Sequence, residues 1–212
     1  MAKPRDIIEA IRRDEFGIGV DLDPQARTIV ANYRRKYTSV LANVAEDLNS
    51  KEFHFILELI QNADDNSYSP ISAPKLSFLL DRNSLVVVNN ETGFTEENVR
   101  ALCSAGESSK KSKSGYIGEK GIGFKSVFKV TDAPEIHSNG YHFRFDRTAR
   151  DDLLAYVVPH WHETHVRLEP GATTLVLPAK PGRSFTLEVL EDVGDALLLF
   201  LGKLRRLEVE AP

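Results

Sequence analysis

The sequence predicts a single α/β layer structure. Residues 53–66 have the apolar spacing of a helix, residues 76–88 that of a two-stranded hairpin, and residues 135–146 hold a second hairpin around Asn139-Gly140, the strongest short turn signal. We find no internal repeat and no change of composition that would mark a domain boundary. One sheet with helices packed against it is therefore the simplest architecture.

The composition is that of an ordinary globular protein. The 212 residues are 42% hydrophobic and 27% charged, and the formal net charge is −4 at pH 7. This acidic balance gives no general attraction to nucleic acids or to anionic lipid, so we expect neither a nucleic-acid nor a membrane partner. The longest apolar run, residues 196–201, is also too short to span a bilayer.

Three features bear on location and completeness. Cys103 is the single cysteine, which excludes an internal disulfide and suits a reducing compartment. The first ten residues are charged and lack the apolar core of a signal peptide, so we expect an intracellular protein, cytoplasmic or nuclear. The sequence stops in the strand-like residues 207–210, and we expect the chain to be a piece of a longer protein.

The N-terminal quarter is predicted to be helical. Residues 6–13 keep helical spacing, and a longer helix is expected from Asp23-Pro24 to Leu48, because this pair supplies a capping side chain and a first-turn proline. We expect residues 1–50 to form a helical extension that packs on a domain of residues 51–212.

Further elements follow the first hairpin. Thr95 can cap a helix that includes Val99 and Leu102. The Ser-, Lys- and Gly-rich residues 104–115 are predicted to be a loop. A helical pattern at 124–128, a strand at 173–177, a helix at 187–204 that contains two glycines, and a final strand at 207–210 complete the chain.

A polar stripe crosses the otherwise apolar helix of residues 53–66. At about 100° per residue, Glu58, Asn62 and Asp65 fall together in the narrow gap left by the apolar side chains. Such a stripe is often only a solvated face. Because so much apolar surface surrounds it, we expect this one to face a cavity.

Four motifs occur in a fixed order: ELIQNADDN at 58–66, NNETGF at 89–94, IGEKGIGFKSVF at 117–128 and GATTLVL at 171–177. Together they resemble the nucleotide-binding motifs of the GHKL ATPases, the family of gyrase, heat-shock chaperone, histidine kinase and MutL. Their amino-acid sequences are most similar to those of the sacsin and NO VEIN-like branch. The resemblance implies a Bergerat fold, an α+β sandwich whose mixed, mostly antiparallel sheet carries helices on one face.

The resemblance also implies ATP or ADP and Mg²⁺ as cofactors, with Glu58 as the catalytic carboxylate and Asn62 as the magnesium ligand. The nucleotide-binding positions that it implies are Asn62, Asp65, Asn89, Gly93, Phe94, Gly118, Lys120, Gly121, Ile122, Gly123, Phe124, Lys125 and Thr173.

The residue types suit this chemistry on their own. Mg²⁺ takes few protein oxygens when phosphates supply the rest, so one amide suffices, and a carboxylate one turn earlier can polarise an attacking water. Gly118, Gly121 and Gly123 let the backbone approach phosphates, and Lys125 adds a charge. A P-loop is excluded because Phe124 stands where that motif needs lysine, and a G-x-G-x-x-G loop would need glycine at Ser126.

Several points stay open at the level of the sequence. Residues 104–115 lie where the family has its ATP lid, but a solvated linker fits them equally well. Asn89 stands where the heat-shock chaperone pattern has an adenine-binding aspartate, and Glu91 takes a place usually held by glycine. The cluster His160, Trp161, His162 and His165 is expected to be structural rather than metal-binding.

Two functions therefore compete. The first is an ATP-binding domain that slowly hydrolyses Mg-ATP, so that lid closure changes the conformation of a larger chaperone-like protein. The second is a nucleotide-binding sensor or scaffold with little or no hydrolysis. A histidine kinase is a weaker third, because no helical hairpin with a phosphoacceptor histidine precedes the first motif. Expected partners are a nucleotide, downstream domains of the parent protein, and protein clients or a dimer partner.

Overall fold

The computed structural model describes residues 2–47, 54–104, 123–148, 153–163, 166–191 and 193–212. Its α-helices are α1 (Pro4–Asp14), α2 (Pro24–Asp47), α3 (His54–Asp65) and α4 (Glu96–Cys103). Its 3₁₀ helices are η2 (Gly123–Lys129), η3 (Leu153–Tyr156), η4 (Leu187–Leu190) and η5 (Asp195–Phe200). Its strands are β1 (Lys75–Asp81), β2 (Ser84–Asn89), β3 (Glu135–Ser138), β4 (Tyr141–Arg144), β5 (His160–Trp161), β6 (Thr173–Pro178) and β7 (Arg206–Glu210).

The strands form one seven-stranded sheet in the order β5-β4-β3-β6-β2-β1-β7. Neighbouring strands are antiparallel except β1 and β7, which are parallel. The two predicted hairpins, β1–β2 and β3–β4, are confirmed, and β6 inserts between them. The predicted fold class, a mixed and mostly antiparallel α+β sandwich, is therefore confirmed.

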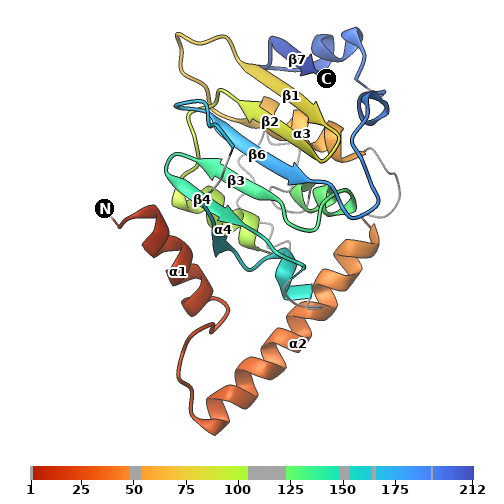
Figure 1. The fold of residues 1–212 in the computed structure, drawn as a ribbon. Coiled ribbons are helices and arrows are strands. Elements are labelled where there is room, and N and C mark those ends of the chain that lie inside the picture. Colours follow the sequence, from red (N-terminus) through yellow and green to blue (C-terminus); the bar gives the residue numbers. More distant parts are fainter. Residues whose placement is uncertain (1, 48–53, 105–122, 149–152, 164–165, 192) are drawn as a thin grey trace.

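Helices α3 and α4 lie behind the sheet in Figure 1. The apolar arc predicted for residues 53–66 is the buried side of α3, where Phe55, Ile56 and Ile60 are at most 1% exposed. Helix α1 packs against β4 and β5, and its Ile8 and Ile11 are fully buried in the same core. In the parts of the chain that the structure describes, no helix is both long and apolar enough to cross a membrane.

Local signals determine several element ends. Asp23 accepts a hydrogen bond from the backbone N–H of Ala26 at 2.8 Å, which caps α2 as predicted. Thr95 and Asn98 form a capping box at the start of α4. Asn139 and Gly140 adopt φ angles of 48° and 80°, so the turn between β3 and β4 has both central residues in the left-handed region, as a two-residue hairpin requires.

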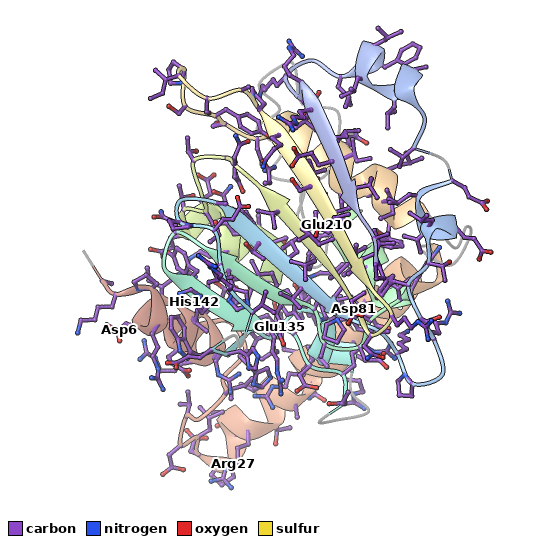
Figure 2. All side chains as sticks on the ribbon, turned by 45° about the horizontal axis from the view of Figure 1, so that its top comes forward. Asp6, Arg27, Asp81, Glu135, His142 and Glu210 are labelled. Carbon is purple, nitrogen blue, oxygen red and sulfur yellow. The ribbon has the colours of Figure 1, made fainter. Side chains whose placement is uncertain are left out.

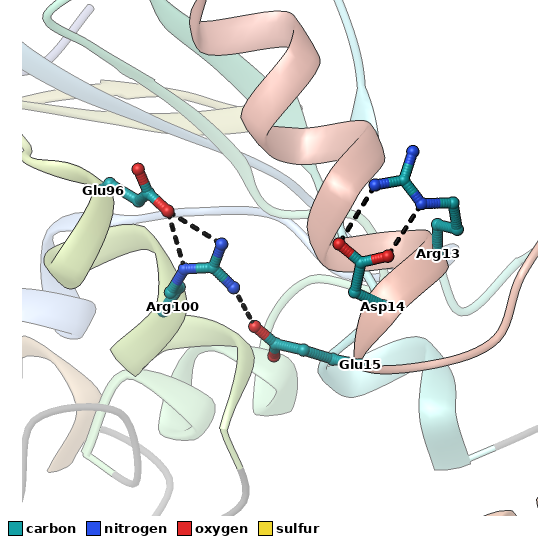
Figure 3. A network of polar contacts seen from close by, with 5 residues as sticks. All are labelled: Arg13, Asp14, Glu15, Glu96 and Arg100. Atoms are coloured by element: carbon teal, nitrogen blue, oxygen red, sulfur yellow. Dashed lines mark hydrogen bonds and ion pairs between the residues drawn. The ribbon is translucent and has the colours of Figure 1, made fainter. Parts of the chain in front are cut away.

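The end of α1 is also fastened to α4 by polar contacts at the surface (Figure 3). Arg100 of α4 bridges Glu96, at 2.7 Å, and Glu15, which follows α1. Arg13 pairs with Asp14 at 2.7 Å beside this network. These side chains are substantially exposed, so solvent and salt screen the pairs and each contributes little to stability. Apolar packing of α1 is the larger contribution.

One sequence prediction is wrong. Residues 187–204 do not form a single helix but two short 3₁₀ helices, η4 and η5, with a bend at residues 202–203 after η5. Gly194 caps η5 in an extended conformation, and the N–H of Gly202 binds a carboxylate of another element instead of a helical carbonyl. The final strand, by contrast, is confirmed as β7.

Asp64, near the end of α3, anchors the segment that leads into β7. Its carboxylate accepts hydrogen bonds from the backbone N–H groups of Gly202, Lys203 and Leu204 at 2.7, 2.7 and 2.8 Å. Burial alone would raise the pKa of this carboxyl, but the three donors outweigh burial and hold the pKa below its ordinary value. The contact ties α3 to the C-terminal strand.

We expect Asp64→Ala to destabilise the domain by roughly 2–4 kcal/mol, because three bonds to a charged acceptor are lost together. A carboxyl with a lowered pKa stabilises the fold above its ordinary pKa, and that contribution is lost as the pH falls through the lower folded value. Urea unfolding of wild type and variant should therefore differ at pH 7 and converge in acid. Asp21→Ala, at an almost fully exposed aspartate, is the matched control. Equal stability of Asp64→Ala and wild type at pH 7 would refute the anchoring role.

Candidate functional site

The polar stripe of α3 is partly covered by the rest of the domain. Glu58, Asn62 and Asp65 are all half-buried, while the apolar positions around them are buried. Helix α3 packs against η2, the short helix that begins at the last glycine of the third motif. The first and third motifs, more than 50 residues apart in sequence, therefore meet in space.

Glu58 lies directly against Gly123. A Cβ atom at Gly123 would stand 2.3 Å from Glu58 Oε2 and 3.3 Å from the carboxyl carbon. Atoms cannot approach so closely, so any side chain at position 123 would displace the Glu58 carboxylate from this place. The carboxylate is thus held against the backbone of the glycine-rich motif.

A cavity of about 100 Å³ opens beside this contact, between α3, α4, η2 and the sheet. Of the predicted site residues, Asn62, Asn89, Phe94, Phe124 and Thr173 line it. They come from all four motifs, so the fold gathers these distant segments around one space. Glu58, Asp65, Gly93 and Lys125 do not line the cavity, although the two neighbours Phe94 and Phe124 do.

Asn89 and Thr173 lie opposite each other across β2 and β6. Asn89 is 5% exposed, and among the described residues its side-chain oxygen has no hydrogen-bond partner. Thr173 Oγ1 lies 2.5 Å from Ser138 Oγ of β3. The sheet thus presents a buried, unused acceptor beside a hydroxyl at one wall of the cavity. An orphaned buried acceptor is costly, which makes it a candidate ligand contact.

The turn after β2 is held in place by the β3–β4 hairpin. Gly93 has a φ of 89°, and a Cβ there would lie 2.8 Å from the Cβ of Asn139. The backbone of Phe94 donates to Ser138 Oγ at 2.8 Å and accepts from Asn139 Nδ2 at 3.0 Å. Gly93 thus serves by conformation and close approach, and it positions Phe94 at the cavity.

Asn90 and Glu91, the two residues that follow Asn89, have different roles. Glu91 is 6% exposed and lines the cavity, so the side chain that stands in place of the usual glycine takes up part of this space. Asn90 points the other way, because its amide accepts from Lys75 N at 2.7 Å and donates to the carbonyl of Ala73 at 2.8 Å. Asn90 therefore stabilises the edge of β1 and does not assist Asn89.

Lys125 is turned inward. It is 3% exposed, its ammonium donates to the carbonyl of Leu102, and Nζ lies 4.3 Å from the centre of the Phe145 ring. Burial lowers the pKa of Lys125 to about 7. The same burial raises the pKa of the neighbouring Cys103 thiol to about 12, so that side chain is inert. In this conformation the ammonium of Lys125 is used on the Leu102 carbonyl, and its contact with phosphate stays a prediction.

Gly118, Lys120, Gly121 and Ile122 lie outside the described residues, as does most of the expected lid, residues 105–115. Their roles in binding phosphate stay predictions.

The histidine-rich segment near β5 binds protein groups. His160 Nδ1 lies 2.9 Å from Arg12, and His162 Nε2 lies 3.0 Å from Glu135. His165 is outside the described residues. Sequence reasoning missed a further pair on the sheet, where Nδ1 of His137 and of His142 lie 3.1 Å apart; Figure 2 marks His142 and Glu135. Across the described ranges, no group of three or more His, Cys, Asp or Glu side chains could hold a metal ion.

The fold and the cavity define an α+β domain in which four motifs converge on one pocket. Residues 80–151 match the family model of the Sacsin domain. Over 153 residues, 72% of this chain, it is 48% identical to Protein NO VEIN of Arabidopsis thaliana, and over 190 residues, 89% of the chain, it is 28% identical to Sacsin of Homo sapiens. The aligned parts cover only 6% and 4% of those two proteins. Similarity to NO VEIN and sacsin is thus confirmed, and the wider GHKL assignment stays a prediction.

Proposed function

We propose that this chain is an ATP-binding domain of the GHKL type, which binds Mg-ATP and hydrolyses it slowly. The observation that carries the proposal is the contact of the Glu58 carboxylate with Gly123, one helical turn from Asn62 in the wall of the cavity. A carboxylate, an amide and a glycine backbone in one place are the groups that phosphate and its metal need.

The wall of the cavity that contains Asn89 and Thr173 offers groups that suit an adenine base. The unused acceptor of Asn89 can receive a hydrogen bond from the exocyclic amino group of adenine, and the hydroxyl of Thr173 can donate or accept beside it. Leu59, Leu76 and Val87 add apolar surface to the same cavity. An apolar slot with a few polar groups is typical of a site for a planar base.

The residues present also fit a magnesium ion. Asn62 offers a side-chain oxygen, and a hard cation that retains waters needs little more from the protein when phosphates are bound. When bound, Mg²⁺ would neutralise charge on the phosphates. In hydrolysis, Glu58 takes a proton from water as the water oxygen attacks the γ-phosphorus. The bond from that phosphorus to the bridging oxygen breaks, and ADP leaves.

We expect Glu58→Ala to bind ATP about as tightly as wild type and to lose hydrolysis, because the base is removed while the cavity wall is kept. Loss of general-base assistance costs roughly 10²–10⁴-fold in rate. Asn62→Ala should instead lose binding of Mg-ATP. Calorimetry and phosphate release measure the two quantities separately. A Glu58→Ala protein that loses both would contradict the assigned role.

The alternative is a nucleotide sensor or scaffold with little hydrolysis. The observation that favours it is Glu91, an acidic side chain buried in the wall of the cavity beside the neutral Asn89. Titration with ATP, ADP and a non-hydrolysable analogue, with and without Mg²⁺, decides between the two. Tight binding with negligible phosphate release would support the sensor. Release that Glu58→Ala abolishes would support the ATPase.

Both relatives are far longer than this chain. We propose that nucleotide-dependent closure is passed to further parts of a larger, chaperone-like protein. Protein clients and a dimer partner stay predictions.

A further inference from the structure

Helix α1 is fastened to β5, an edge strand of the sheet, by the side chain of Arg12. Its Nη1 donates a hydrogen bond to the carbonyl oxygen of Pro159 at 2.8 Å and lies 2.9 Å from Nδ1 of His160. The Arg12 side chain is only 17% exposed. Arg5, near the start of α1, lies over the ring of Trp161 at 5.8 Å. These polar contacts of α1 thus gather on one short strand.

The contact with Arg12 determines the protonation state of the His160 ring. A guanidinium group keeps its charge at every physiological pH and has only N–H donors. Nδ1 of His160 must therefore be the acceptor, which means that it carries no proton. The neutral ring, with its proton on Nε2, satisfies this geometry. An imidazolium does not, because it has an N–H at both nitrogens and would point one of them at the N–H of Arg12.

The charges around His160 come from α1 and from β4 with the residues after it, and α1 and β4 both pack against β5. Arg12 and Arg144, which lies opposite His160 in the β4–β5 ladder, disfavour a charged ring. Glu9 and Asp146 favour it, but each is already paired, Glu9 with Arg12 at 3.2 Å and Asp146 with Arg144 at 2.6 Å. Burial and the charge of Arg12 together hold the pKa of His160 below its ordinary value.

We propose that the contact between Arg12 and His160 is a pH-sensitive switch, which docks α1 on β5 while the ring is neutral and loosens the helix in mild acid. When α1 is undocked, His160 takes up a proton at its ordinary pKa of about 6.5, whereas the docked state disfavours that proton. Docking is therefore at full strength above this pH and loses strength as the pH falls below it.

The switch acts on one helix and not on the whole domain. The apolar packing of Ile8 and Ile11 does not titrate, so acid should change how often α1 opens while the rest of the domain stays folded. The same helix is followed directly by Glu15, which binds Arg100 of α4, and α4 contributes Leu102 to the cavity. The switch thus lies two contacts away from the candidate site, although it does not depend on nucleotide binding.

The test measures hydrogen exchange of the α1 amides at pH 7.5 and pH 5, each rate divided by the intrinsic rate of an unfolded chain at that pH. We expect the opening equilibrium of α1 in the wild type to be about tenfold larger at pH 5, while amides of α3 change much less. His160→Asn keeps a side-chain acceptor but cannot take up a proton, so its α1 should open equally at both pH values, to within about threefold. His162→Asn, at a histidine that binds Glu135 instead of an arginine, is the matched control and should keep the wild-type rise.

Titration of the histidine rings by NMR gives a second measurement that the wild type alone can fail. The His160 ring should titrate below the ordinary value, and Arg12→Met, which removes the donor and its charge, should move the midpoint back toward that value. A wild-type ring that titrates at or above the ordinary value would overturn the inference. So would a His160→Asn protein whose α1 still opens about tenfold more at pH 5. Neither measurement involves a nucleotide, so such a failure leaves the proposed function standing.

Discussion

Replacing Gly123 with alanine is expected to stop nucleotide turnover while leaving the domain folded. The new methyl group would lie 2.3 Å from Glu58 Oε2, so the carboxylate must leave its place. Because this carboxylate is the far end of a flexible side chain, it can move at little cost to the fold. We expect a change in unfolding free energy within about 1 kcal/mol, and a fall in the rate of phosphate release of roughly 10²-fold or more.

The matched control is Gly194→Ala. Among the described residues other than its chain neighbours, none has an atom within 4 Å of a Cβ built at Gly194, which caps η5 with a φ of −95° that alanine also adopts. Phosphate release by this variant should equal that of the wild type. Both variants are compared by thermal unfolding first, so that a loss of activity is not a loss of folded protein.

The double variant Glu58→Ala, Gly123→Ala tests whether the two residues act through one contact. If the alanine at 123 acts by displacing the carboxylate, it should have little further effect once the carboxylate is gone. A double variant that is much less active than Glu58→Ala would show that Gly123 has another role, such as backbone approach to phosphate. Unchanged turnover in Gly123→Ala alone would contradict the assignment of Glu58.

The local parts of this fold were predictable because they follow short-range rules. The helical period of α3 placed Glu58, Asn62 and Asp65 on one side and the apolar residues on the other, and the structure confirms that division. Asn139-Gly140 has the one dipeptide chemistry that suits a two-residue hairpin, and the turn is found there. In both cases the information lies within a few residues of the element.

Long-range arrangement was not predictable in the same way. The insertion of β6 between two hairpins brings Thr173 opposite Asn89, 84 residues earlier in the chain. No local pattern encodes that pairing, and only the family resemblance indicated that the two share a pocket. The prediction of one helix over residues 187–204 was wrong although the helical spacing is present. The backbone N–H groups of residues 202–204 donate to the Asp64 carboxylate instead of to helical carbonyls.

The role of a residue in the candidate site depends on both its local sequence and the long-range arrangement of the fold. The type and spacing of residues identified Asn89 as a candidate for the base, but not the direction in which its amide points. Only the structure shows that the side-chain oxygen of Asn89 is buried at the cavity without a partner among the described residues.

Lys125 shows the same limit of local information. A lysine after a glycine-rich motif predicts a phosphate contact, but in the structure this side chain is buried beside the ring of Phe145. We expect Lys125→Met to stabilise the domain at pH 7 by about 1–3 kcal/mol. Keeping a lysine in an apolar place is costly, and methionine fills similar volume without a charge. The loss of the bond to Leu102 offsets part of the gain.

The pH dependence gives this prediction its sign. Burial lowers the pKa of Lys125 from 10.5 to about 7, so between these values the unfolded chain binds more protons than the folded one. The stability of the wild type relative to Lys125→Met should therefore rise with pH from 7 to 10, by up to ~4 kcal/mol. Chemical denaturation at several pH values measures it. Lys180→Met, whose ammonium lies 3.4 Å from Asp132, is the control and should keep the wild-type slope.

Nucleotide affinity then separates the two possible roles of Lys125. If its ammonium stays on the Leu102 carbonyl when nucleotide binds, Lys125→Met should bind ATP as the wild type does and differ only in stability. If the side chain turns outward to a phosphate, removing it deletes a charge-assisted bond, and affinity should fall by about tenfold or more. A variant that is neither more stable at pH 7 nor flatter in its pH profile would refute the buried, low-pKa state. The position of one side chain thus connects the stability of the domain to the pocket that we propose for ATP.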